Sequence, residues 1–166
     1  MIMNLLEQTK YLIKKINLRP DKLKGQNFCI SREVLKQMVA AAEISNQDII
    51  LEVGAGFGFL TTELLTKAKK VIAVEMEPAL VKVLRQLEAV HKNLEVIEGD
   101  ILKISPLSFR AQPADSAGEA EKSLSTFKGF LHSSDIAFGK SESVGMTKSQ
   151  NYKLGANLPY GLTSAF

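Results

Sequence analysis

The sequence has few of the residues that build disulfides and metal sites. Its 166 residues include one cysteine, Cys29, and two histidines, His91 and His132, which lie far apart in the chain. A single cysteine cannot form an internal disulfide, and the histidines lack ligand-like spacing. We therefore expect no metal site. No histidine is near Cys29 in sequence to activate its thiol, which we interpret as a packed side chain.

Long apolar runs are also missing. The longest stretches, such as residues 71–74, are far shorter than the roughly 20 residues that a membrane-spanning helix needs. The first residues carry Glu7 and Lys10 where a signal peptide would need an apolar run. With 45% apolar and 23% charged residues, the composition is typical of a soluble globular domain. These features predict a cytoplasmic protein that does not bind a membrane.

Positive charge is concentrated at the start of the chain. Residues 1–30 carry six lysines and arginines against two acids, a charge of +4, which leaves −1 for the rest of a chain whose net charge is +3. Such a basic arm suits a phosphate backbone, but a solvated helix face is the commoner reason for scattered lysines. Charge alone leaves both interpretations open.

Apolar periodicity predicts strands that alternate with helices. Helices are expected over 3–16, 31–42, 59–67 and from Pro78 onward, and strands over 48–53, 71–75, 94–98 and 152–156. Ser31 is a good N-cap, and Pro78 suits a first helical position. Alternation at this spacing implies βαβ units, hence a Rossmann-like α/β fold with a parallel sheet and helices on both faces.

The chain divides into four segments by composition. We assign a basic N-terminal helix and arm to 1–30, a Rossmann-like core to 31–104, and the fourth strand with its motif to 151–166. Between them, 105–150 holds ten serines and no persistent period, which predicts a flexible Ser/Gly-rich insertion.

A glycine-rich motif follows the first expected strand. In EVGAGFG, residues 52–58, the glycines Gly54, Gly56 and Gly58 let the backbone turn sharply and approach a ligand closely. A simple strand-to-helix turn would explain the glycines alone. A dinucleotide site would have a glycine or alanine at position 59, where this chain has Phe59.

Acidic residues at the strand ends favour one cofactor. Glu75 ends the second strand, where a carboxylate can accept both ribose hydroxyls, and Asp100 follows the third, where it can accept from an adenine amine. Glu52 adds an acid ahead of the glycines. S-adenosylmethionine fits this set better than NAD, because its cationic sulfonium and amino-acid end need carboxylate and carbonyl oxygens rather than a helix terminus lined by N–H groups.

The tetrapeptide NLPY, residues 157–160, follows the fourth strand and would reach the same edge of the sheet. An Asn157 side-chain oxygen and a neighbouring carbonyl could accept both N–H bonds of an exocyclic amine and localise its lone pair, which is catalysis by positioning and electrostatics. Tyr160 could stack on a base that has left its helix. An ordinary Asn-Pro turn is the other explanation of the tetrapeptide.

Taken together, the motifs resemble the ribosomal RNA adenine-N6,N6-dimethyltransferase family. In the family's order, the chain has GQNF at 25–28, EVGAGFG at 52–58, Glu75, GD at 99–100 and NLPY at 157–160. Leu158 is similar to this family rather than to the double-proline motif of DNA adenine methyltransferases. The motifs favour the type that acts on small-subunit (16S) ribosomal RNA.

The resemblance implies a class I S-adenosylmethionine-dependent methyltransferase fold and a role for each motif. The cofactor would be bound by Gln26, Asn27, Phe28, Glu52, Gly54, Gly56, Gly58, Glu75, Met76, Asp100, Ile101 and Asn157. The catalytic motif would be Asn157, Pro159 and Tyr160, and RNA would contact Lys22 and Lys24. The implied partner is ribosomal RNA within the small ribosomal subunit.

Three features depart from the family's pattern. Gly161 stands where a second Asn is usual, and the insertion at 105–150 is longer than the usual connection. Later strands and a C-terminal helical domain are absent, so we expect the edge of the fourth strand to be unpaired and apolar surface around Leu154 and Leu158 to be exposed. A methyltransferase for large-subunit RNA or a small molecule, and a non-catalytic assembly factor, remain as alternatives.

Overall fold

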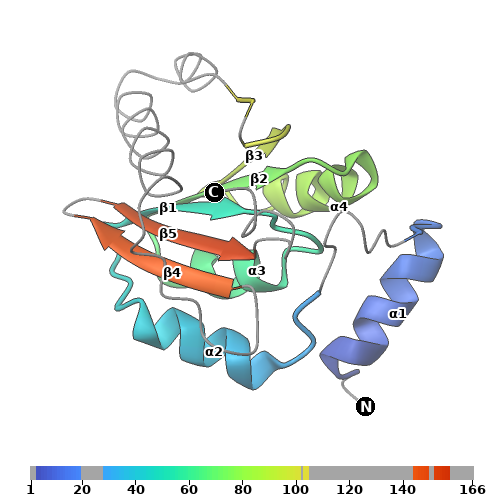
Figure 1. The fold of residues 1–166 in the computed structure, drawn as a ribbon, viewed down its shortest axis with the longest axis horizontal. Helices are drawn as coiled ribbons and strands as arrows, with labels where there is room; N and C mark the ends of the chain where they lie inside the picture. Colours follow the sequence, from blue (N-terminus) through green and yellow to red (C-terminus); the bar gives the residue numbers. More distant parts are fainter. Residues whose placement is uncertain (1–2, 20–27, 102, 105–143, 150–151, 158–166) are drawn as a thin grey trace.

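The computed structural model describes residues 3–19, 28–101, 103–104, 144–149 and 152–157. It contains a five-stranded sheet with the strand order β3-β2-β1-β5-β4 (Figure 1). Four strands run parallel: β1 (Ile49–Val53), β2 (Lys70–Glu75), β3 (Leu94–Glu98) and β5 (Tyr152–Asn157). The fifth, β4 (Val144–Ser149), pairs antiparallel with β5 at the edge. This confirms the α/β class and its parallel core.

Three helices cover one face of the sheet. They are α2 (Arg32–Ala41), α3 (Phe59–Leu65) and α4 (Pro78–Glu88), and they share one apolar cluster with alternate residues of the strands. Ile50, Val71 and Leu94 face this cluster from neighbouring positions of the sheet. Leu64 and Leu84, both 0% exposed, fill its centre. The sequence predicted helices on both faces of the sheet. In the described residues, α2, α3 and α4 all pack on the same face.

Local sequence signals set where these helices begin. The Ser31 side chain accepts a hydrogen bond from the Val34 N–H and caps α2, as predicted. Pro78 stands at the first turn of α4, where its missing N–H costs nothing. Among the described residues, no helix is long and apolar enough to cross a membrane.

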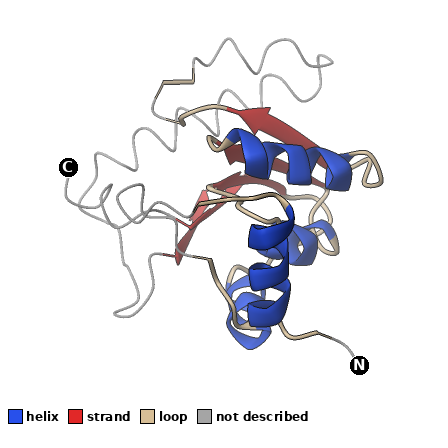
Figure 2. Cartoon of the chain, turned by 90° about the vertical axis from the view of Figure 1, so that its right-hand side faces the viewer, coloured by secondary structure: helices blue, strands red, loops and turns tan. Residues whose placement is uncertain are grey.

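The N-terminal helix α1 (Leu5–Lys15) packs beside the sheet domain (Figure 2). A capping box starts it: the Asn4 side chain accepts from the Glu7 N–H, and the Glu7 carboxylate accepts from the Asn4 N–H. Leu5 joins the main apolar cluster, whereas Leu12 and Ile13 join a second cluster around Leu18, Phe57 and Leu80.

The structure corrects the interpretation of the insertion at its C-terminal end. Residues 144–149 were assigned to a flexible segment, but they form β4. The expected unpaired edge of the fourth strand is also wrong, because β4 pairs with β5 along its whole length, from Ser149 opposite Tyr152 to Val144 opposite Asn157. The sequence VGMTKS has only two apolar residues, Val144 and Met146, which is too short a pattern to predict a strand, and its strand conformation is seen through its pairing with β5.

Candidate functional site

The carboxyl ends of the parallel strands bring the predicted motifs to one edge of the sheet. Glu75 pairs with Glu98, directly before Gly99 and Asp100. Val53 pairs with Val74 on one side and with Ala156 on the other, so the glycine loop begins level with Asn157, the last residue of β5. In open parallel α/β sheets, ligands bind outside this edge, beside the strand at which the strand order changes direction. In this sheet that strand is β1.

Glu75 holds the glycine loop to the start of α4. Its Oε2 accepts the Gly56 N–H at 2.8 Å, and its Oε1 accepts the N–H groups of Met76 and Glu77, both at 2.9 Å. An ionised carboxylate has about four acceptor positions, so these bonds use three of them. The side chain is 6% exposed and keeps one acceptor position, on Oε2, whereas accepting both ribose hydroxyls, as expected from the sequence, would need two.

The three loop glycines have different roles. Gly54, Gly56 and Gly58 have φ of 72°, 61° and 78°, a conformation that other residues adopt only with strain. A Cβ on Gly56 would lie 3.5 Å from the Phe28 ring, in ordinary contact. On Gly58 it would lie 3.0 Å from Leu84 Cδ2. Gly58 therefore lets α3 and α4 approach each other, and it does not line the pocket described next, whereas Gly54 and Gly56 do.

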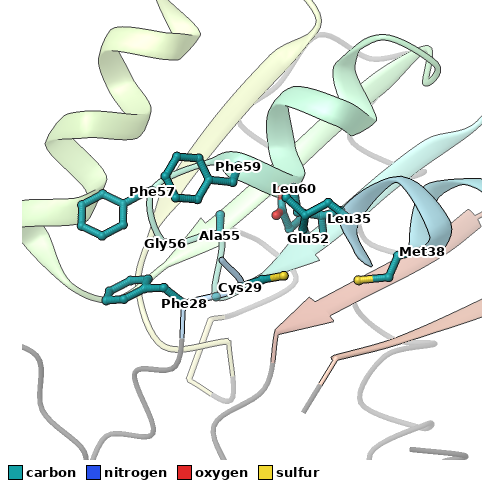
Figure 3. Close-up of a pocket in the computed structure, with 11 residues that line it drawn as sticks. Phe28, Cys29, Leu35, Met38, Glu52, Ala55, Gly56, Phe57, Phe59 and Leu60 are labelled. Carbon is teal, nitrogen blue, oxygen red and sulfur yellow. The ribbon is translucent and has the colours of Figure 1, made fainter. Parts of the chain in front are cut away.

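A small pocket lies under the loop, between it and α2 (Figure 3). Its cavity of about 30 Å³ is large enough for one or two water-sized groups. The lining is apolar apart from the Glu52 carboxyl, and it consists of Phe28, Cys29, Leu35, Met38, Glu52, Gly54, Ala55, Gly56, Phe57, Phe59 and Leu60. Phe28 and Phe57 close one side, with ring centroids 4.6 Å apart.

Glu52 is the polar group of this pocket. It is 2% exposed, and its Oε2 has no hydrogen-bond partner among the described residues. Burial raises the pKa of this carboxyl to about 8, the neighbouring Thr61 partly opposes the shift, and the negative charge of Glu75 adds to it. A buried acceptor that lacks a donor fits a ligand with a positive charge or N–H groups.

The remaining predicted cofactor residues differ in their surroundings. Asp100 begins a turn, because its carbonyl accepts from Lys103 and Ile104, and its Oδ2 lies 3.5 Å from Lys103 Nζ. Ile101 is buried at 4% exposure, whereas Met76, beside Glu75, is 52% exposed. Of these side chains, only Met76 offers a broad surface to a ligand.

Several predictions concern residues outside the described part of the structure. They are Lys22, Lys24, Gln26, Asn27, Pro159 and Tyr160. Conversely, the motifs did not identify Leu35 and Met38 as pocket residues. Their spacing on one face of α2 indicated burial, but periodicity cannot distinguish a pocket wall from a core. Within the described ranges, no cluster of three or more histidine, cysteine or acidic residues could hold a metal ion.

Fold and site together define a Rossmann-like α/β protein with a candidate ligand site at the glycine loop. Residues 18–166 match the family described as ribosomal RNA adenine dimethylase, and the chain belongs to that family. This confirms the resemblance that the motifs indicated.

Two relatives show how much of such proteins the chain represents. A probable ribosomal RNA small subunit methyltransferase A of Methanosarcina mazei is 48% identical over 93 residues, which are 56% of this chain and 34% of the relative. The ribosomal RNA small subunit methyltransferase A of Dehalococcoides mccartyi is 33% identical over 162 residues, 98% of this chain and 43% of the relative. The chain thus spans less than half the length of these curated relatives.

Among solved structures, the chain is similar to a dimethyladenosine transferase from Plasmodium falciparum. The two are 39% identical, the match covers 45% of this chain and 28% of that one, and the TM-score is 0.42.

Proposed function

We propose that this chain is part of an S-adenosylmethionine-dependent enzyme that transfers two methyl groups in succession to the N6 atom of adenines in small-subunit ribosomal RNA. The substrate is ribosomal RNA in the small subunit, in the cytoplasm. The observation that carries the proposal is the buried Glu52 carboxyl, whose Oε2 has no hydrogen-bond donor among the described residues and which lines the same pocket as Gly54 and Gly56. Family membership and the names of the relatives support the reaction.

The residues at the sheet edge fit this cofactor. When bound, S-adenosylmethionine supplies a methyl group on a positively charged sulfur. The backbone at Gly54 and Gly56 would hold its amino-acid end, with the ammonium group toward the Glu52 carboxyl, and the remaining acceptor position of Glu75 would take one ribose hydroxyl. Asp100 would accept from the adenine amine, with Met76 and Ile101 nearby. Gln26, Asn27 and Phe28 would border the same site.

The target base would be positioned by the NLPY motif. The Asn157 side-chain oxygen would accept an N–H bond of the adenine amine, which concentrates the nitrogen lone pair and orients it. Pro159 would stiffen the turn, and Tyr160 would stack on the base, which contributes about 1–3 kcal/mol. Lys22 and Lys24 would contact the RNA backbone.

The reaction is tested with the full-length gene product. Ribosomal RNA from a deletion strain, complemented with the wild-type gene or with Asn157→Ala, is digested and analysed for N6,N6-dimethyladenosine by mass spectrometry. We expect the wild type to restore the modification in small-subunit RNA and Asn157→Ala to fail. A matched control is Asn46→Ala, an exposed substitution in the turn before β1, at the opposite edge of the sheet.

Other outcomes would overturn the proposal. Modification that maps to large-subunit RNA would assign a different substrate. A wild-type protein that leaves all adenines unmodified, or an Asn157→Ala variant that restores methylation fully, would contradict the proposed chemistry.

The cofactor is tested by isothermal titration with S-adenosylmethionine. Glu52→Gln replaces a carboxyl that can ionise by a neutral amide of nearly the same size, and Glu33→Gln makes the same replacement at an exposed position of α2. We expect affinity to fall at least tenfold, about 1.4 kcal/mol, for Glu52→Gln only. Equal affinities of the two variants would exclude Glu52 from the site.

A further inference from the structure

Helix α1 has two faces with different partners. Its inner face, with Leu12, Ile13 and Ile16, packs against the cluster that contains Phe57 of the glycine loop and Leu80 of α4. Both residues lie just after carboxyl ends of strands, Phe57 after β1 and Leu80 after β2. Figure 1 shows α1 on the side toward which the arrowheads of β1 and β5 point. The helix is thus fixed next to the edge where the candidate site lies.

The outer face of α1 is basic and carries an exposed aromatic ring. Lys10, Lys14 and Lys15 are exposed, and Tyr11 lies among them with 56% of its surface accessible. Lys15 Nζ is 5.9 Å from the centre of the Tyr11 ring. The one acid in this helix, Glu7, accepts the N–H of Asn4 in the capping box. We call Lys10, Tyr11, Lys14 and Lys15 the basic face of α1.

Some basic side chains elsewhere in the described residues have carboxylate partners. Arg32 pairs with Glu63 at 3.4 Å, Lys70 with Glu95 at 2.7 Å and Arg85 with Glu88 at 2.7 Å. The three lysines of the basic face form no ion pair with any residue in the described ranges. Their charge is therefore not neutralised locally and is available to an anionic partner.

We propose that the basic face of α1 binds the RNA substrate, with its lysines on backbone phosphates and Tyr11 against an unpaired base. This inference rests on the proposed function and adds a contact surface to it. RNA fits better than a membrane, because an interfacial helix would need its apolar face for lipid, and that face is packed on Phe57 and Leu80. Alternating cations and an aromatic ring are the combination that binds single-stranded nucleic acid.

The packing of α1 gives this contact a consequence for catalysis. RNA held by the basic face would be held on a helix whose other face contacts the loop that borders the cofactor. An adenine on the same RNA strand would then lie near the carboxyl edge of the sheet, close to Asn157, and positioning it in the site would cost less entropy. Loss of the contact is expected to weaken substrate binding, while turnover at saturating RNA stays near that of the wild type.

The test compares two sets of three lysines in the full-length protein. One variant carries Lys10→Gln, Lys14→Gln and Lys15→Gln. The control carries Lys67→Gln, Lys69→Gln and Lys92→Gln, which replace exposed lysines before β2 and β3, at the opposite edge of the sheet. A third variant replaces the α1 lysines by arginine, which keeps the charge, and circular dichroism checks that all of them fold.

Binding of a labelled stem–loop RNA with adenines in its loop is measured by fluorescence anisotropy at several salt concentrations. Each phosphate contact contributes about 0.7–0.9 to the slope of log affinity against log salt, so the α1 variant should lose about 2–3 units of slope. From about 50 to about 200 mM salt, the wild type should then lose affinity by roughly 20- to 40-fold more than the variant. The control and the arginine variant should match the wild type.

The outcomes separate the two proposals. Equal slopes for the α1 variant and the control would overturn the inference while leaving the RNA methyltransferase intact. A wild-type protein that binds no RNA and methylates none would overturn the proposed function itself. Salt-dependent binding of the basic face to anionic lipid vesicles, with no change in RNA affinity, would also contradict the inference.

Discussion

Replacing Glu52 by glutamine should remove a pH dependence from the stability of the fold. The buried carboxyl has its pKa raised from 4.5 to about 8, so the folded state retains a proton that the unfolded chain releases at lower pH. A raised folded-state pKa of an acid makes stability highest below the unfolded pKa, and the free energy of unfolding then falls by about 1.4 kcal/mol per pH unit up to the folded pKa.

The shift sets the size of the effect. From 4.5 to about 8 is about 3.5 units, which amounts to about 5 kcal/mol over the full window. Domains of this size are stable by about 5–15 kcal/mol, so ionised Glu52 would be a serious cost without a ligand. A cationic cofactor beside the carboxylate would offset this cost.

The assay is urea unfolding followed by circular dichroism at several pH values. Between about pH 5.5 and about pH 8, the stability of the wild type should fall by about 3 kcal/mol relative to Glu52→Gln. Glu33→Gln, an exposed change on α2, should follow the wild type. Parallel pH curves for the wild type and Glu52→Gln would refute the reasoning, because they would mean that Glu52 ionises equally easily in both states.

Three further predictions concern the glycine loop and the core, each measured as a change in the free energy of unfolding in urea. Gly58→Ala should destabilise by about 2–4 kcal/mol, more than Gly56→Ala at about 1–2, because only the former adds a clash with Leu84 to the strain of a positive φ; equal losses would contradict a packing role. Glu75→Gln should cost about 2–4 kcal/mol, since an amide cannot accept at both ends from three N–H donors; a loss below about 1 would mean that the loop is held by other contacts. Leu64→Ala should destabilise the fold by about 2–5 kcal/mol, because Leu64 is 0% exposed and its truncation would leave a cavity in the core. A near-neutral result would mean that the core is loosely packed there.

The strands and helices of the sheet domain followed closely from local sequence. Ser31 and Pro78 marked helix starts because capping and proline geometry depend only on neighbouring residues. By contrast, β4 was missed, since its residues have no strand pattern of their own and pair with a strand that follows in the chain. The face that the helices cover is another property that periodicity could not assign, because all five residues of β1, Glu52 included, are buried and give no one-sided pattern.

The candidate site was predictable in position and less so in mechanism. Motif order placed Glu75 and the glycines at one edge, because parallel strands end together there. The sequence could not show that Glu75 already accepts three backbone N–H groups. Two of these come from its neighbours Met76 and Glu77, but the third comes from Gly56, 19 residues away, and depends on the folded loop. Glu75→Ala would therefore disturb both the loop and a ligand, so loss of binding in that variant would not by itself identify a ribose contact.

Glu52 is the better probe of the site for the same reason. Its Oε2 has no partner among the described residues, so its replacement by glutamine breaks no backbone contact of that oxygen. A ligand effect and a stability effect should then have opposite signs: weaker cofactor binding, but a more stable fold at pH 8. Replacing a residue with a purely structural role would instead lower both cofactor affinity and fold stability. The sign of the stability change therefore separates a group that serves the ligand from one that serves the fold.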